Sequence, residues 1–233
     1  MEKLVYLLSK DPTRPGGAFA DTLLESVGPA LASDDRVHGL TIEVPDLADD
    51  PRVTDAHLTG RGREIGGAVS VWLDRVEDRV LVDEALSEAG APAAGYLVTE
   101  SMVQPYAARE WPDGEKSPGV TQFVVFEQPN GLPDAEFFER WHGRISPMSF
   151  DLHPTRTRYV RNVVARRLTK GAPNWRAIVS ERWDSLDEWL DPAKLYSSPG
   201  LFKAMQAVGF AEPASISLTL TSEWILKSGA GCA

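Results

Sequence analysis

The feature that most constrains the fold of this 233-residue chain is an order of candidate strands and helices that occurs twice. Apolar spacing in the first half predicts strand, helix, strand, strand, helix, strand, at 4–8, about 16–32, 37–44, 68–73, about 77–89 and 93–100. The second half predicts the same order, at 120–127, about 133–146, 158–165, 175–183, about 186–208 and 215–226. A polar stretch at 45–67 is expected to be a surface excursion. The chain therefore reads as one unit of about 110 residues used twice.

Local sequence matches favour this repeat, since "VSVWLDRVED" at 69–78 parallels "IVSERWDSLDE" at 178–188. The order β-α-β-β-α-β is that of a ferredoxin-like unit, whose sheet has helices on one face only. Two bare sheet faces in one chain can bury each other. We therefore expect an α+β fold in which two tandem ferredoxin-like units form a pseudo-dimeric α/β barrel. The expected domains are 1–110, an acidic barrel partner, and 118–228, which carries the candidate site.

Charge and composition narrow the function classes. The net charge is −10, and residues 1–116 hold 22 acidic and 11 basic residues, against 12 and 13 in residues 117–233. This acidic balance argues against nucleic acid as a partner, and no apolar run approaches the ~20 residues of a membrane helix. The single cysteine, Cys232, cannot form an internal disulfide, and the N-terminus lacks the pattern of a secretory signal. A cytoplasmic location is the resulting expectation.

Several signatures of well-known enzyme classes are missing from the sequence. The glycine-rich "GRGREIGG" at 60–67 lacks the Lys-Ser/Thr ending of a phosphate-binding loop and precedes a strand rather than a helix. Neither a His-x-x-x-His metal pattern nor a G-x-S-x-G elbow is present. A nucleotide-dependent enzyme, a zinc hydrolase and a serine hydrolase are therefore not expected, and no cofactor is predicted.

The most informative segment runs from Asp134 to Arg167. On its helix, Phe138, Trp141 and Ile145 share one face, and His142 lies at the edge of that apolar stripe. A nearby helix C-terminus would raise the pKa of the imidazole while apolar burial would lower it. Two interpretations of His142 stay open: a packed, hydrogen-bonded helix residue, or a general acid/base.

This segment resembles the EthD-like branch of the dimeric α/β barrel superfamily. The matching positions, in order and spacing, are Phe137, Trp141, His142, Pro147, Tyr159, Val160 and Asn162. The resemblance implies a ferredoxin-like unit that forms barrels by dimerisation or tandem duplication. Relatives in the superfamily include cofactorless monooxygenases, polyketide cyclases, decarboxylases and haem-binding enzymes, so the resemblance implies the fold more closely than the reaction. The first half lacks the matching histidine and tryptophan, so if His142 takes part in chemistry, the chain has one such site, in its second half.

Candidate substrate contacts lie close to His142 in the sequence. They are Arg144, His153, Arg158, Tyr159, Asn162 and Trp175. Tyr159 and Asn162 must lie on opposite faces of their strand, because they are three residues apart in a two-residue period. Seven basic residues lie between 156 and 176. Either they form a solvated face, or one or two of the arginines among them anchor an anionic or phenolic substrate.

The leading hypothesis is a cofactor-independent enzyme of the cyclase, decarboxylase or monooxygenase type. It would act on a small apolar, aromatic or polyketide-like metabolite, with His142 as general acid/base. One alternative is a non-catalytic protein that binds a hydrophobic ligand. Another is a haem-binding barrel with His142 or His153 as axial ligand. Pairing into a homodimer is also compatible with barrels of this kind.

Overall fold

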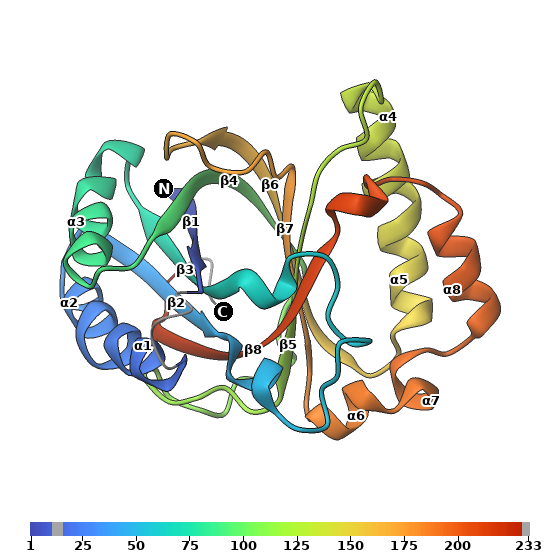
Figure 1. Ribbon diagram of the computed structural model, residues 1–233, viewed down its shortest axis with the longest axis horizontal. Coiled ribbons are helices and arrows are strands. Elements are labelled where there is room, and N and C mark those ends of the chain that lie inside the picture. Colours follow the sequence, from blue (N-terminus) through green and yellow to red (C-terminus); the bar gives the residue numbers. More distant parts are fainter. Residues whose placement is uncertain (11–15, 230–233) are drawn as a thin grey trace.

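A computed structural model describes residues 1–10 and 16–229, so Cys232 lies outside the described residues. Eight antiparallel strands form a closed barrel in the order β1-β3-β2-β8-β5-β7-β6-β4 (Figure 1). Their bounds are β1 (Glu2–Ser9), β2 (Val37–Val44), β3 (Ile65–Leu73), β4 (Ala93–Gln104), β5 (Val120–Phe126), β6 (Arg156–Arg167), β7 (Ala177–Trp183) and β8 (Ser217–Lys227).

The barrel consists of two four-stranded sheets that meet at two seams. The first half contributes β4-β1-β3-β2 and the second half contributes β6-β7-β5-β8, which is the strand order of a ferredoxin-like unit in each case. Strand β2 pairs with β8 at one seam, and β4 pairs with β6 at the other. The expectation of two ferredoxin-like units forming a pseudo-dimeric α/β barrel is confirmed.

Helices cover the outside of the barrel, with α1–α3 on one side and α4, α5 and α8 on the other (Figure 1). Their bounds are α1 (Gly16–Thr22), α2 (Gly28–Ala32), α3 (Val80–Glu88), α4 (Asp134–Phe138), α5 (Ser146–Leu152), α6 (Leu186–Leu190), α7 (Pro192–Leu195) and α8 (Pro199–Gln206). Short 3-10 turns occur at Pro45–Asp49, Gly62–Glu64, Val76–Arg79 and Pro213–Ser215.

The first helix of each half differs from the continuous α-helix that the spacing predicts. A π-helical segment separates α1 from α2 (Leu23–Val27) and α4 from α5 (Glu139–Ile145). Each wide turn comes just before a proline, which has no N–H for an α-helical hydrogen bond. Gly28 and Ser146 instead donate their N–H to the carbonyl five residues back. The helical path of the second half therefore continues beyond the expected end at 146, to Leu152.

Side chains alternate between the helix layer and the barrel interior. On β1, Leu4 and Leu8 pack under the helices of the first half, whereas Val5 and Leu7 belong to an apolar cluster inside the barrel. Strand β8 likewise turns hydroxyl groups inward: Thr221 is buried and donates to Glu43 at 2.5 Å. The interior thus has an apolar part and a polar part.

The polar stretch after β2 differs from the expected surface excursion. Ala48, Val53 and Leu58 are buried, and they pack with residues of the second half that include Trp189 and Leu220. The outer face of β8 carries aliphatic side chains that need a cover, and this segment supplies part of it. The segment therefore contributes to the core although its composition is polar.

Gly62 fixes how closely this segment approaches β8. A Cβ built on Gly62 would overlap the main-chain carbonyl of Leu218, which bonds to Thr59 beside it. We expect Gly62→Ala to lower the free energy of unfolding by about 1–3 kcal/mol, the usual cost of overpacking. Urea denaturation measures this, with Gly200→Ala as control, because the space around Gly200 accepts a methyl group. Equal stability of the two variants would contradict the close approach.

Candidate functional site

His142 lies in the π-helical segment, between the helices of the second half and the outer face of β6. We call this layer, defined by His142, Ser146, Tyr159 and Arg161, the interlayer. The ring of His142 is 5.1 Å from that of Phe138 and 4.6 Å from that of Trp141. Its Nε2 atom is buried and has no hydrogen-bond partner among the described residues. A buried polar atom of this kind marks a position where a ligand could bind.

The pKa of His142 is lowered to about 4, first by burial and then by the positive charge of Arg161. The sequence left the direction of this shift open. Burial prevails because the helix continues into α5, so that no helix C-terminus lies next to the imidazole. His142 is therefore neutral at pH 7 and can accept a proton or a hydrogen bond.

This shift has a consequence for stability that can be measured. Between pH 6.5 and about 4, the unfolded chain binds a proton at His142 that the folded chain excludes, so stability falls as the pH falls through this window. We expect His142→Gln to make the decline in the urea midpoint between pH 7 and pH 4.5 shallower. A decline as steep as that of the wild type would contradict the burial of this ring.

Arg161 and Tyr159 reach the interlayer from β6, together with Ser146 from the start of α5. Arg161 Nη1 donates to Ser146 Oγ at 2.6 Å, and Ser146 Oγ lies 3.2 Å from the Tyr159 hydroxyl. Burial, followed by the charge of Glu181, raises the pKa of Tyr159 to about 12. Like His142 Nε2, the Nε atom of Arg161 is buried without a partner among the described residues. The interlayer thus combines an acceptor and a cationic donor, each with an unused nitrogen.

Sequence reasoning did not select Arg161 or Ser146 for the site. The signal for Arg161 was present, since strand alternation places it on the same face as Tyr159. Ser146 had no such signal, because its position depends on the π-helical turn before it.

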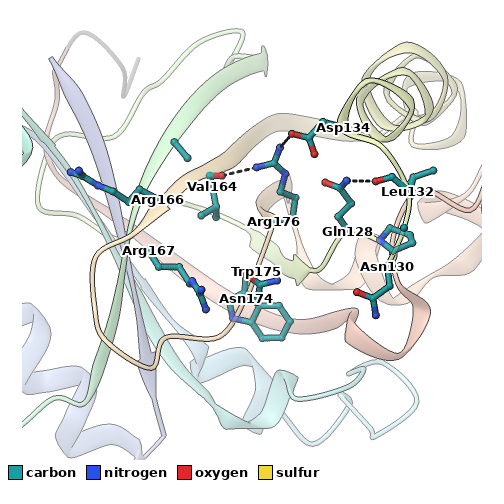
Figure 2. Close-up of a pocket in the computed structure, with 13 residues that line it drawn as sticks. Gln128, Asn130, Leu132, Asp134, Val164, Arg166, Arg167, Asn174, Trp175 and Arg176 are labelled. Carbon is teal, nitrogen blue, oxygen red and sulfur yellow. Dashed lines mark hydrogen bonds and ion pairs between the residues drawn. The ribbon is translucent and has the colours of Figure 1, made fainter.

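A pocket of about 390 Å³ opens where the β5–α4 connection passes the β6–β7 connection (Figure 2). Residues 128–132, 134, 164–167 and 174–176 line it. Arg176 pairs with Asp134 at 2.9 Å and donates to the carbonyl of Val164 (Figure 2). Arg167 donates to the carbonyl of Ala172. The buried Trp175 supplies an aromatic surface. This lining suits a small molecule that has polar or anionic groups.

One side chain, that of Phe138, lies between the pocket lining and the interlayer. The guanidinium of Arg176 lies 5.2 Å from the ring of Phe138, and Phe138 in turn contacts His142. Phe138 is half-buried. A single aromatic ring thus connects the lining of the pocket to the candidate base.

Arg158 and Asn162 lie inside the barrel, where strand alternation places them. Arg158 Nη1 pairs with Glu223 at 2.8 Å, and Asn162 Nδ2 donates to the carbonyl of Ile178 at 3.1 Å. Both side chains line a small chamber of about 20 Å³. They are thus separated from Tyr159 by the sheet itself.

The two remaining sequence candidates lie away from His142. Arg144 is exposed on the π-helical segment. His153 is buried, with Nδ1 2.9 Å from the carbonyl oxygen of Leu195 and its ring between those of Trp183 and Tyr196. Burial lowers the pKa of His153. These contacts give His153 a packing role at the end of α5.

A haem group does not fit the histidines as they are placed. An axial ligand needs an open side next to a flat cavity, whereas aromatic rings pack on both His142 and His153, and neither residue lines the pocket or the chamber. Within residues 1–10 and 16–229, no cluster of three or more His, Cys, Asp or Glu side chains is arranged to hold a metal ion. Over the same residues, none of the helices has the length and apolar character needed to cross a membrane.

Comparisons with known proteins place the fold. No family model and no curated protein matches the sequence. An anthrone oxidase-like protein superposes with a TM-score of 0.56 at 15% identity, covering 98% of this chain and 95% of that one. A provisionally assigned monooxygenase from Fusobacterium nucleatum subsp. nucleatum gives 0.50 at 12%, with 97% and 92% covered. A provisionally assigned chlorite dismutase gives 0.50 at 9%, with 95% of each chain covered.

These likenesses extend over nearly the whole of each chain and show the class of fold, a dimeric α/β barrel. Both sheets of the barrel come from a single chain here. At such low identities the likeness shows the fold alone, so the activity must be argued from the site.

Proposed function

We propose that the protein is a small-molecule enzyme of the oxidase or monooxygenase type that acts on an aromatic compound with a phenolic or similar oxygen. The observation that carries this proposal is the pair of unused buried nitrogens in the interlayer, His142 Nε2 and Arg161 Nε. Leaving a buried donor or acceptor unpaired costs about 1–3 kcal/mol, so a ligand that satisfies both regains that energy.

The chemistry of the two groups is complementary to a phenol. A neutral imidazole accepts the hydroxyl proton, and a guanidinium stabilises the phenolate that forms. His142 and Arg161 do not line the pocket, and the rings of Phe138, Trp141 and Tyr159 pack around them. A substrate whose planar body lies in the pocket would therefore reach the two nitrogens only when the half-buried ring of Phe138 moves aside. Polar substituents farther from the reacting oxygen would contact the arginines of the adjoining pocket. His142 is then the catalytic base, and Arg161 the electrostatic stabiliser.

Two further observations support the choice of reaction class. The segment around His142 resembles the EthD-like branch of the superfamily, which includes cofactorless monooxygenases among its wider relatives. Two of the structural neighbours carry oxidase or monooxygenase names. We accordingly propose a reaction that needs no bound cofactor. Dioxygen adds to a C–H carbon of the phenolate ring, and the hydroperoxide that forms loses water to leave a quinone, so one oxygen atom enters the product and the substrate itself supplies the electrons that reduce the other to water.

The proposal is tested with a panel of hydroxylated tricyclic and bicyclic aromatics. Binding is followed by quenching of tryptophan fluorescence, and turnover by oxygen uptake. At least one compound should both bind and consume oxygen. Binding without turnover by any compound would favour the alternative, a non-catalytic protein that holds a hydrophobic ligand. Absence of both would overturn the proposal.

Arg161→Met tests the cationic half of the site. The substitution keeps an extended apolar side chain but removes the charge, and a hydrogen bond to a charged group contributes about 1.5–3 kcal/mol. We therefore expect Kd for a phenolic ligand to rise about 10- to 150-fold, measured by fluorescence titration. Arg144→Met is the matched control, since it makes the same substitution at an exposed arginine of the π-helical segment. Equal affinities in the two variants would remove Arg161 from the site.

A further inference from the structure

Two carboxyl groups face each other inside the barrel, at the seam where the two halves of the chain meet. Glu43 on β2 and Glu223 on β8 are direct cross-strand partners. Glu43 is 4% exposed and Glu223 is fully buried. Two ionised carboxylates at such a position would repel each other strongly, because little water screens them.

The surroundings of the two carboxyl groups are unequal. Glu223 pairs with Arg158 at 2.8 Å and lies 3.7 Å from Arg182 Nε. It also accepts hydrogen bonds from the hydroxyls of Tyr106 and Ser117, at 2.7 and 2.9 Å. Glu43 accepts a hydrogen bond from the neutral hydroxyl of Thr221. The cations thus favour the ionised form of Glu223 much more than that of Glu43.

Both carboxyl groups line the chamber of about 20 Å³, as do Arg158 and Asn162. Arg158 and Asn162 are each only 4% exposed. Even so, Arg158 Nε and Asn162 Oδ1 have no hydrogen-bond partner among the described residues. A cavity of this size accommodates about one water molecule when two to four polar groups surround it. One donor and one acceptor are therefore available for such a molecule.

We propose that the barrel interior is a second polar site, in which a neutral Glu43 and an ionised Glu223 enclose one water molecule bound by Arg158 and Asn162. Glu43 then stores a proton at the seam between the halves. This site is separate from the interlayer and does not depend on the proposed enzymatic function.

Electrostatics around Glu43 agree with this assignment. Burial, followed by the charge of Glu223, raises the pKa of Glu43. Burial alone would raise the pKa of Glu223, but Arg182 and Arg158 lower it overall. The charged and titratable groups that face the interior come from all sides of the barrel: Lys3 on β1, Glu100 on β4, Tyr106 after β4, Arg158 on β6, Arg182 on β7 and Glu223 on β8. Lys3 is itself paired with Glu100 at 2.6 Å.

Infrared spectroscopy of the full-length protein tests the proton. At pH 7 the wild type should show the carbonyl stretch of one protonated buried carboxyl group, separate from the carboxylate bands. Glu43→Gln should lose this band. Glu100→Gln is the control and should keep it, because Glu100 is a carboxylate of the same interior that is paired with a lysine. A wild type without the band, or a band that survives in Glu43→Gln, would overturn the proposal.

A second measurement remains decisive if the infrared band is weak. The folded wild type keeps its proton on Glu43 while the unfolded chain loses it above about pH 4.5, so the wild type loses stability as the pH rises from there. The Tm of Glu43→Gln should therefore increase relative to that of the wild type between pH 5 and pH 7. If the difference in Tm between Glu43→Gln and the wild type stays constant over this pH range, Glu43 is ionised in the folded protein. A crystal structure should show one water molecule next to Arg158 and Asn162. A chamber without water would contradict the proposed water site.

Discussion

Glu223→Ala is expected to lower the free energy of unfolding by about 3–5 kcal/mol, the usual cost of removing one partner of a buried ion pair. The reason is that Arg158 and Arg182 are buried, with exposed fractions of 4% and 1%. The substitution removes the carboxylate that pairs with Arg158 and lies nearest to Arg182. The two buried guanidinium groups would then lose their ionised partner, and the carboxyl group that stays nearby is that of Glu43, which would have to ionise in a buried position to replace it. Such a loss is a large part of the ~5–15 kcal/mol that stabilises most domains.

Urea denaturation at pH 7 measures this effect. The control is Glu115→Ala, which removes an exposed carboxylate from the segment between β4 and β5 and should change stability by no more than about 0.5 kcal/mol. A loss below about 1 kcal/mol for Glu223→Ala would show that water or a rearranged side chain compensates the arginines. The ion pair would then be less tightly enclosed than the structure shows.

His142→Gln is expected to reduce turnover of a phenolic substrate by about 10²–10⁴-fold, the range for loss of a general base. Glutamine has a similar size and can still hydrogen-bond, so Kd should change much less than kcat. In the wild type, the pKa of about 4 keeps His142 neutral, so kcat should depend little on this group above pH 5 and should fall as the pH approaches 4.

The matched control is His57→Gln, because His57 lies next to Trp189 in the 45–64 segment, outside the interlayer. Its turnover should equal that of the wild type. Full turnover in His142→Gln would leave His142 as a packed residue, which was the other interpretation of the sequence. Equal losses in kcat and in affinity would indicate a positioning role rather than proton transfer.

The sequence predicts the barrel well because the periodicity of strands and that of helices are both patterns of neighbouring residues. Apolar residues two apart or three to four apart identify strands and helices without knowledge of the fold, and their order identifies the ferredoxin-like unit. The same alternation separates Tyr159 from Arg158 and Asn162, as the structure also does. Strand alternation therefore predicted correctly which side chains lie on each face of β6.

What the sequence could not predict depends on contacts between distant residues. Glu43 and Glu223 are paired only because the barrel closes between β2 and β8. The polar composition of the 45–64 segment hid Val53 and Leu58, whose burial depends on the second half. The π-helical turns rotate the residues after them around the helix axis relative to regular α-helical spacing. The contact between Ser146 and Tyr159 therefore could not be predicted from that spacing.

Closure of the barrel also limits how copies of this chain can associate. Each of the eight described strands has a neighbour on both sides, so the sheet offers no free edge to which a strand of another molecule could be added. A homodimer would have to form through side chains on the helices and connections, where Val80 and Phe150 are exposed. Such an interface can be disrupted by surface substitutions that leave the barrel hydrogen bonds intact.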